Sequence, residues 1–236
     1  MPRHIGIILD GNRRYGLSNH LTGFEAIYAS GADRLDDLLA WCIDLGIPAV
    51  TLWVFSTENF DRAPEEVSGA MRAVENKLRS LCNNEDIHRA QVHVRTVGRL
   101  ELLPHSTRAA VQAAEAATRD YHGLELTLAA AYGGREEIVD AVKSYLDAPE
   151  RRDWPASKAA AALTADAIAE HLYAPNLPDL DLVIRTSGEI RLSGFLLWQS
   201  AYSEFYFTDV FWPAFRRIDF LRAIRAYQQR KRRFGH

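Results

Sequence analysis

Cysteine is scarce in this sequence: Cys42 and Cys82 are the only two in 236 residues, and they form no CxxC pair. Two cysteines without such a pattern exclude a disulfide framework as the basis of the fold. No signal-peptide pattern follows Met1. These absences predict a protein of the reducing cytoplasm.

Long hydrophobic runs are also missing. The longest, such as Ala129–Tyr132 and Phe195–Trp198, are far shorter than the roughly 20 residues that a membrane-spanning helix needs. There is no excess of positive charge either, because the formal net charge is −3. We therefore expect no transmembrane segment, at most peripheral membrane contact, and no nucleic-acid partner. Any anion site must be built from locally clustered Arg and Lys.

The chain does have enough apolar residues, 47% of 236, to form one substantial core, which predicts a single domain over residues 1–236. Short β-rich runs alternate with longer segments of helical period. This alternation predicts an α/β fold, with a mostly parallel central sheet flanked by helices. The expected strands are 5–9, 49–55, 92–97, 124–131 and 182–186, and the expected helices are 25–45, 64–81, 107–121 and 135–146. We expect residues 148–162, which contain two prolines, to form an irregular surface connection.

Polar clusters follow four of the expected strands. They are Asp10–Arg14, Ser56–Asn59, Gly133–Arg135 and Arg185–Glu189. Ligands of open parallel sheets usually bind outside the carboxyl ends of the strands. The sequence therefore predicts that these four loops converge on one rim and form a site there.

The first and last of these loops have the chemistry of a diphosphate site. A carboxylate at Asp10 suits Mg²⁺, and arginine pairs bidentately with phosphate oxygens. Arg185, Arg191 and Ser193 could all face one diphosphate. The alternatives are that Asp10 caps the next helix and that Arg185 pairs with Glu189. Walker A, GxGxxG and HExxH patterns are absent, which argues against a P-loop NTPase, a dinucleotide enzyme and a zincin.

Taken together, these segments resemble the motif series of the cis-prenyltransferases, the undecaprenyl diphosphate synthase family, and are closest in character to its short-chain bacterial members, such as Z-farnesyl diphosphate synthase. The series runs from end to end of the chain. It comprises HIGIILDGNRR (4–14), FSTEN (55–59), YGGR (132–135), IRTSGE (184–189), FLLWQSAYSE (195–204), WP (212–213) and RRFG (232–235). The resemblance implies the α/β fold of that family, a homodimer, and a Mg²⁺-dependent reaction. In that reaction an allylic diphosphate ionises and is attacked by isopentenyl diphosphate, with release of pyrophosphate.

The resemblance also implies a role for each matched residue. Asp10 would hold Mg²⁺ and assist departure of the allylic diphosphate, with Glu204 as a second metal contact. Asn59 and Ser56 would lie near the proton that is lost. Substrate binding would fall to Gly11, Asn12, Arg13, Arg14, Tyr28, Phe60, Arg62, Arg185, Arg191, Ser193, Arg233 and Gly235. Of these, Arg14 and Arg62 would grip the allylic diphosphate and Arg185, Arg191 and Ser193 the homoallylic one. The C-terminal residues Arg233–Gly235 would reach into the partner subunit's site. The alternative is that they form an ordinary solvent-exposed, basic helix end.

The chain departs from the family pattern near the allylic site. Phe24 stands where most members have arginine, and Ile27 and Tyr28 stand where they have glycine and histidine. Arg13 replaces the common glycine, a change shared with the shorter-chain bacterial relatives, while Tyr15 stands where tryptophan is usual and Ile190 replaces a polar residue. These differences put the identity of the allylic partner, dimethylallyl or geranyl diphosphate, in doubt.

Product length is the second open question. In long-chain members the helix after the Arg62 loop lines a deep apolar tunnel, whereas Glu75, Asn76 and Lys77 stand here. Burying such groups without partners would cost on the order of 2–7 kcal/mol each, which favours a short product of about fifteen carbons. The alternatives are head-to-middle, lavandulyl-type joining of two allylic units, a longer-chain synthase, a non-catalytic partner subunit, and a diphosphate hydrolase.

Overall fold

A computed structural model describes residues 1–229 of the chain. At its centre lies a six-stranded sheet in the order β3-β4-β2-β1-β5-β6, in which every neighbouring pair is parallel. The strands are β1 (His4–Ile8), β2 (Ala49–Ser56), β3 (His93–Val97), β4 (Glu125–Tyr132), β5 (Leu182–Arg185) and β6 (Glu204–Phe207). The predicted α/β fold with a parallel sheet is confirmed.

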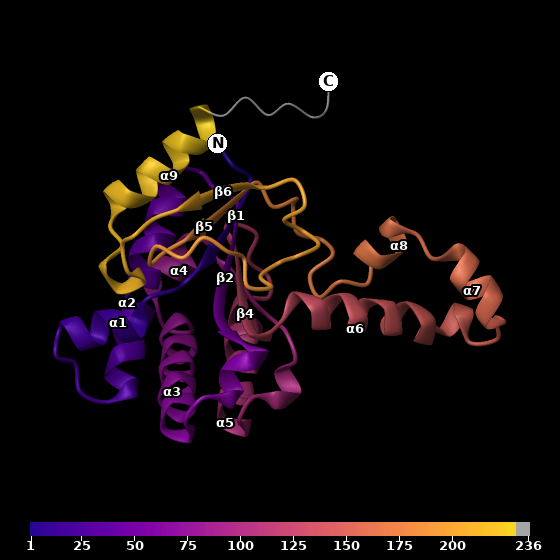
Figure 1. Cartoon of the computed structure of the whole chain (residues 1–236), viewed down its shortest axis with the longest axis horizontal. Helices are drawn as coiled ribbons and strands as arrows, with labels where there is room; N and C mark the ends of the chain where they lie inside the picture. The colour runs from indigo at the N-terminus through magenta and orange to yellow at the C-terminus, as the bar shows by residue number, and fades with distance from the viewer. Residues whose placement is uncertain (230–236) are drawn as a thin grey trace.

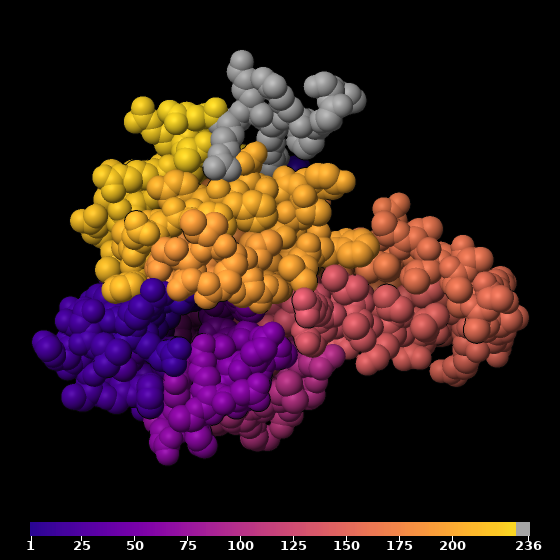
Figure 2. All heavy atoms as spheres, in the orientation of Figure 1, coloured from indigo at the N-terminus to yellow at the C-terminus, as the bar shows by residue number. Residues whose placement is uncertain are grey.

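The helices of residues 1–229 are α1 (Asn12–Ser18), α2 (Phe24–Asp44), α3 (Pro64–Leu81), α4 (Glu85–Arg89), α5 (His105–Thr118), α6 (Gly134–Asp147), α7 (Ala156–Ala162), α8 (Ala165–Ala169) and α9 (Arg217–Gln229). Short 3₁₀ helices are η1 (Thr57–Asp61), η2 (Leu100–Leu102), η3 (Pro149–Arg151) and η4 (Trp212–Ala214). Helices α2, α3, α5 and α9 lie over one face of the sheet, whereas the other face is packed by non-helical segments that contribute Leu180, Phe195 and Leu196 (Figure 1). In the space-filling view, α6 carries α7 and α8 outward as an arm (Figure 2).

Two sequence expectations about elements need correction. Residues 148–162 are not an irregular connection, because they contain η3 and α7, which begins directly after Pro155. Strand β6 was missed altogether. It has four residues, all half-buried at the edge of the sheet, so it shows neither the length nor the alternation by which a strand is recognised.

Helices α2 and α3 pack against each other over one face of the sheet, and the main core lies beneath them. Helix α3 begins at Pro64, whose missing N–H costs nothing in a first turn, and Glu65 follows at the positive end of the helix dipole. Both helices start near the carboxyl ends of the strands that precede them. Their first turns therefore stand beside the rim where the polar loops were expected.

Candidate active site

The turn after β1 depends on a glycine. Gly11 has φ +100°, and a Cβ there would lie 2.7 Å from the Phe211 ring and 3.0 Å from Cβ of Ser187. Its N–H donates to Oδ1 of Asp10 at 2.7 Å. Only glycine accepts this backbone and this crowding without strain, so Gly11 fixes where the Asp10 carboxylate points.

Arg185 joins the end of β5 to Asp10 and to the following loop. Its Nη2 donates to Oδ2 of Asp10 at 2.8 Å, and its Nη1 donates to Oγ of Ser193 at 2.9 Å and to the Arg191 carbonyl at 2.5 Å. The Arg185 side chain is buried, and within residues 1–229 its Nε has no hydrogen-bond partner. A buried guanidinium with an unused donor is suited to bind an anion.

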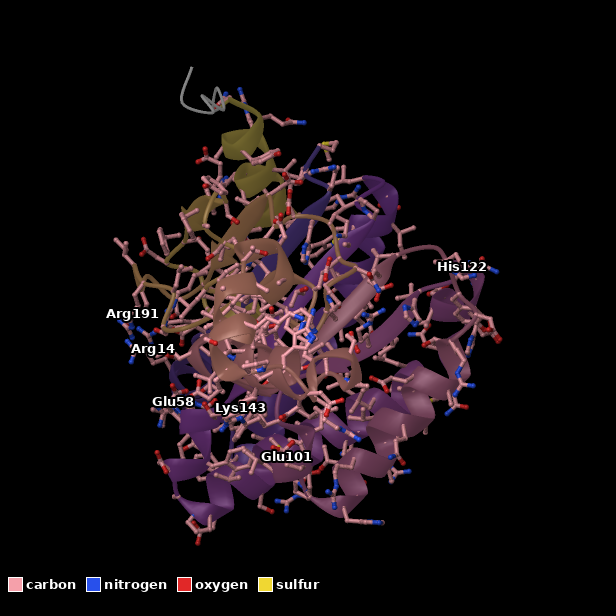
Figure 3. The ribbon with its side chains drawn as sticks, turned by 90° about the vertical axis from the view of Figure 1, so that its right-hand side faces the viewer. Arg14, Glu58, Glu101, His122, Lys143 and Arg191 are labelled. Atoms are coloured by element: carbon pink, nitrogen blue, oxygen red, sulfur yellow. The ribbon has the colours of Figure 1, made fainter. Side chains whose placement is uncertain are left out.

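Two more arginines meet at Glu189. Arg14 lies 3.6 Å from its carboxylate, and Arg191 forms a close ion pair with it. Figure 3 shows the Arg14 and Arg191 side chains together at one edge of the molecule. The alternative that Arg185 pairs with Glu189 is wrong, because Arg185 pairs with Asp10 instead.

Arg14 completes this group, which we call the rim cluster: Asp10, Arg14, Arg185, Glu189 and Arg191. The Nη2 atom of Arg14 donates to Oγ of Ser187 at 2.6 Å and lies 3.9 Å from Oδ1 of Asp10. Three arginines against two carboxylates leave the cluster with a formal charge of +1. The rim cluster is thus locally positive in a chain of net charge −3.

Asp10 is ionised in this setting. Burial acts to raise the pKa of its carboxyl group, but the hydrogen bond and charge of Arg185, with the Gly11 N–H, outweigh burial and hold the pKa below its ordinary value. Residues 1–229 contain no group of three or more His, Cys, Asp or Glu side chains that could hold a metal. Proteins commonly bind Mg²⁺ through one or two carboxylates plus substrate phosphates, without an all-protein cage. The single Asp10 carboxylate fits a Mg²⁺ ion that is bound in this way.

A second polar cluster lies at the start of α3. Oε1 of Glu66 accepts from the Tyr28 hydroxyl at 2.6 Å and from Nη1 of Arg62 at 2.9 Å, and Arg13 lies 3.5 Å from Oε2. Arg62 also donates to the Tyr28 hydroxyl at 2.8 Å. We call these four residues the Glu66 cluster.

Burial and the hydrogen bond to Glu66 raise the pKa of Tyr28 to about 12, so the phenol is neutral and donates. Tyr28, Arg62 and Arg13 were predicted from the sequence to bind substrate, but Glu66, the carboxylate that they share, was not predicted. The i,i+4 spacing of Arg62 and Glu66 was the available signal.

Ser56 and Asn59 form a capping box on η1. The Ser56 N–H donates to Oδ1 of Asn59 at 3.1 Å, and the Ser56 side chain accepts from the Asn59 backbone. Phe60 packs edge-on against Phe55, with ring centroids 4.9 Å apart. These three predicted residues are thus fixed by local structure at the end of β2.

An apolar cavity of about 70 Å³ lies between α2, α3 and the sheet. Asn12 reaches it from the rim: its Nδ2 donates to the Leu9 carbonyl at 2.9 Å, while its buried Oδ1 has no partner within residues 1–229. The cavity is lined by Leu9, Asn12, Tyr28, Gly31, Ala32, Leu35, Leu52, Val54, Ala70, Ala73, Val74, Lys77, Leu128 and Trp212. It therefore runs inward from Asn12, which follows the Asp10 turn, and from Tyr28 of the Glu66 cluster.

The polar stretch of α3 does not face the cavity as a unit. Glu75 pairs with Arg79 on the outer surface and lines a separate groove toward α5, and Asn76 is exposed. Only Lys77 lines the cavity. Glu75 and Asn76 therefore do not line this cavity, because a helix turns successive residues to different faces.

The structure does not bring Glu204 to Asp10. Glu204 is level with Leu182 in β5, which in turn is level with Ile5 in β1, whereas Asp10 lies beyond the other end of that strand. Five residues of strand span roughly 16 Å, so the two carboxylates of one chain cannot share an ion. The predicted contacts Arg233 and Gly235 lie outside the described residues.

Comparison with known proteins agrees with this architecture. The family model described as "Putative undecaprenyl diphosphate synthase" matches residues 8–235. An isoprenyl transferase of Deinococcus radiodurans is 50% identical, over 100% of this chain and 85% of the relative. A (2Z,6E)-farnesyl diphosphate synthase of Thermobifida fusca is 49% identical, over 99% and 90%.

A tritrans,polycis-undecaprenyl-diphosphate synthase (geranylgeranyl-diphosphate specific) of Methanopyrus kandleri is also 49% identical, over 100% of this chain and 85% of the relative. Among solved structures, lavandulyl diphosphate synthase from Lavandula x intermedia, in complex with dimethylallyl diphosphate, has a TM-score of 0.88 and 31% identity, covering 100% of this chain and 98% of that one. The family match spans nearly the whole chain and includes both loops of the rim cluster. The chain therefore belongs to the undecaprenyl diphosphate synthase family and is a prenyltransferase.

Proposed function

We propose that this enzyme is a short-chain cis-prenyl diphosphate synthase, which condenses dimethylallyl or geranyl diphosphate with isopentenyl diphosphate and releases pyrophosphate. The proposal rests on the position of a positively charged cluster beside an apolar cavity. A net-positive cluster of three arginines and an ionised Asp10 stands at the rim from which an apolar cavity opens between α2 and α3. A diphosphate head and a prenyl tail need these two environments side by side.

In this proposal the two clusters together bind the two diphosphates, and Arg14 of the rim cluster acts with the Glu66 cluster. Arg185, Arg191 and Ser193 hold isopentenyl diphosphate. Arg14 and Arg62 grip the allylic diphosphate, with support from Arg13, Tyr28 and the backbone N–H groups near Gly11 and Asn12. The Glu66 cluster keeps Arg62 in place through two hydrogen bonds.

Asp10 would hold Mg²⁺ together with substrate phosphates, and the metal would neutralise charge that develops on the departing diphosphate. The allylic C1–O bond breaks, C4 of isopentenyl diphosphate bonds to C1, and C2 of that unit loses a proton. Arg14 and Arg62 stabilise the pyrophosphate as it leaves. Asn59 and Ser56, fixed by their capping box, stand in the loop that we assign to the proton-loss step.

We assign a product of about fifteen carbons, because the cavity is small and a polar lysine lines it, where a growing chain would have to displace a buried charged group. The (2Z,6E)-farnesyl diphosphate synthase of Thermobifida fusca supports this choice. The lavandulyl diphosphate synthase neighbour favours head-to-middle joining as a second candidate. The long-chain relative of Methanopyrus kandleri favours a third, a longer product.

We further propose a cytoplasmic homodimer. Within residues 1–229 no helix is long and apolar enough to cross a membrane. Strand β6 forms one edge of the sheet and leaves Phe205, Tyr206 and Phe207 half-buried. Exposed edge strands are usually covered, and a second copy of the chain is the cover that the family resemblance implies.

Product analysis tests the proposal. The protein is incubated with Mg²⁺ and dimethylallyl, geranyl or farnesyl diphosphate, with and without isopentenyl diphosphate, and the dephosphorylated products are identified by mass and retention against Z and E standards. We expect a fifteen-carbon Z product that requires isopentenyl diphosphate. A product from dimethylallyl diphosphate alone would favour the lavandulyl-type reaction, longer products would favour a polyprenyl synthase, and release of inorganic phosphate without condensation would contradict all three.

A further inference from the structure

Among residues 1–229, Lys77 is the one lysine or arginine that lines the apolar cavity. Its side chain is only 9% exposed, and the neighbouring lining residues on its helix are Ala70, Ala73 and Val74. A buried lysine among such neighbours is uncommon, because the ammonium group loses its hydration unless it finds a partner. The cavity would be more apolar with almost any other residue at this position, so the lysine needs an explanation.

Helical spacing places Lys77 at the inner end of the cavity. On α3 the lining residues recur at Ala70, Ala73, Val74 and Lys77, which is one face of a helix. On α2 they begin with Tyr28, which bonds to Arg62 at the rim. Seven residues of helix advance about 10 Å, so Lys77 lies roughly that far inward from Ala70.

The charged end of Lys77 is anchored on the opposite helix. Its Nζ donates to Oδ2 of Asp36 on α2 at 2.7 Å, and the Asp36 side chain is 47% exposed. The apolar stem of the lysine therefore crosses from α3 to α2, and its buried head meets a carboxylate that is partly exposed at the surface. The Lys77 side chain thus lies across the space between the two helices that line the cavity.

We propose that Lys77, held by Asp36, closes the inner end of the cavity and sets the length of the product. The inference rests on the proposed function and names the residue that determines its product length. A tail that fits between the rim and the lysine stem is accommodated. One more five-carbon unit would have to displace the stem or press against the buried ammonium group.

The test compares product lengths in three variants. Lys77→Ala removes the stem and the charge, and we expect products longer by one or more five-carbon units. Lys77→Met keeps most of the stem without the charge, and we expect a smaller shift in the same direction. Asn76→Ala is the matched control, because Asn76 is the exposed neighbour on the same helix, and its products should equal those of the wild type.

Products are measured at several ratios of isopentenyl to allylic diphosphate, with folding of each variant checked by circular dichroism. If Lys77→Ala does not fold, Lys77→Met carries the test. Wild-type product lengths in both Lys77 variants at every ratio would overturn the inference while leaving the proposed function intact. A wild-type protein that incorporates no isopentenyl diphosphate would instead overturn the proposed function. Lengthening in Asn76→Ala equal to that in Lys77→Ala would also overturn the inference, because it would indicate a general loosening of α3.

Discussion

At the scale of single residues, the rim cluster shows how one buried arginine can organise a site. Arg185 orients the Asp10 carboxylate and the Arg191 and Ser193 loop at the same time, through three hydrogen bonds from two nitrogen atoms. Its Nε remains unused within the described residues. In the proposed function, the Asp10 carboxylate and the Ser193 loop are thus held in place before a diphosphate binds, which reduces the reorganisation that binding requires.

Asp10→Ala should lower turnover by orders of magnitude, because the proposed metal contact and the orientation of the leaving group depend on this carboxylate. Asp10→Asn is the matched control for folding, since its amide oxygen can still accept from Arg185. We expect both variants to be nearly inactive, with the melting temperature of Asp10→Asn close to that of the wild type. Steady-state rates at saturating Mg²⁺ check this, and more than about a tenth of wild-type rate in either variant would remove Asp10 from the mechanism.

Arg191→Ala should chiefly raise the apparent KM for isopentenyl diphosphate. Its side chain is 58% exposed and its guanidinium, among residues 1–229, pairs with Glu189, so folding should not depend on it. Loss of a charge-assisted contact costs about 1.5–3 kcal/mol, or roughly 10- to 150-fold in kcat/KM. Arg89→Ala, which removes another exposed arginine, paired with Asp86, is the control. An unchanged KM with both substrates varied would show that Arg191 points elsewhere.

At the scale of elements, periodicity predicted where most strands and helices lie, and α3 matches its expected bounds of Pro64–Leu81. Apolar alternation and helix-start signals are local, so they can be read without a partner element. Which residue of α3 faces the cavity could not be predicted from such local signals. Whether Glu75, Asn76 or Lys77 faces the cavity depends on how α3 packs on α2, and Asp36, the partner of Lys77, is 41 residues away in sequence. Nothing local encodes that contact.

Strand β1 carries a buried histidine that links it to two other segments. Nδ1 of His4 lies 2.8 Å from the Pro178 carbonyl and Nε2 lies 2.8 Å from Oγ1 of Thr51 in β2. A carbonyl only accepts, so Nδ1 carries the hydrogen and Nε2 accepts from Thr51. Burial is the largest influence and lowers the pKa of His4, against the backbone hydrogen bond and nearby carboxylates, which act to raise it.

This lowered pKa predicts a loss of stability in mild acid. The unfolded chain takes up the His4 proton below about pH 6.5, while the folded chain resists it, so the stabilisation is full above that pH and declines as pH falls toward the folded-state pKa. The slope from one group is at most about 1.4 kcal/mol per pH unit. Urea unfolding between pH 5 and 8 measures it, and His4→Gln should show a shallower decline. Equal slopes in the two proteins would contradict the assignment.

At the scale of the whole molecule, the parallel sheet explains why residues far apart in sequence form one site. Every strand of the sheet runs the same way, so Asp10 after β1 and Thr186 to Ser193 after β5 emerge at the same rim. Glu204 lies away from Asp10 of its own chain for the same reason, because it stands at the start of β6 and so at the opposite end of the sheet. The sequence could place loops after strands, but it could not reveal that residue 204 begins a strand.

The proposed dimer can be tested by mixing two inactive chains. One carries Asp10→Ala with an intact C-terminus, and the other keeps Asp10 but ends at residue 229, so that Arg233 and Gly235 are lost. If the C-terminal segment serves the partner's site, half of the sites in each mixed dimer have both Asp10 and a C-terminal segment. Random mixing of equal amounts should then restore about a quarter of wild-type activity.

If the segment instead serves its own chain, no site in any dimer has both features, and the mixture stays as inactive as its components. Refolding the two chains together ensures exchange of subunits, and light scattering on the same sample measures the mass. A monomer mass would contradict the homodimer. Dimers without restored activity would retain the homodimer and reject the contribution of the C-terminal segment to the partner's site, because two-fold symmetry otherwise guarantees one complete site in each mixed dimer.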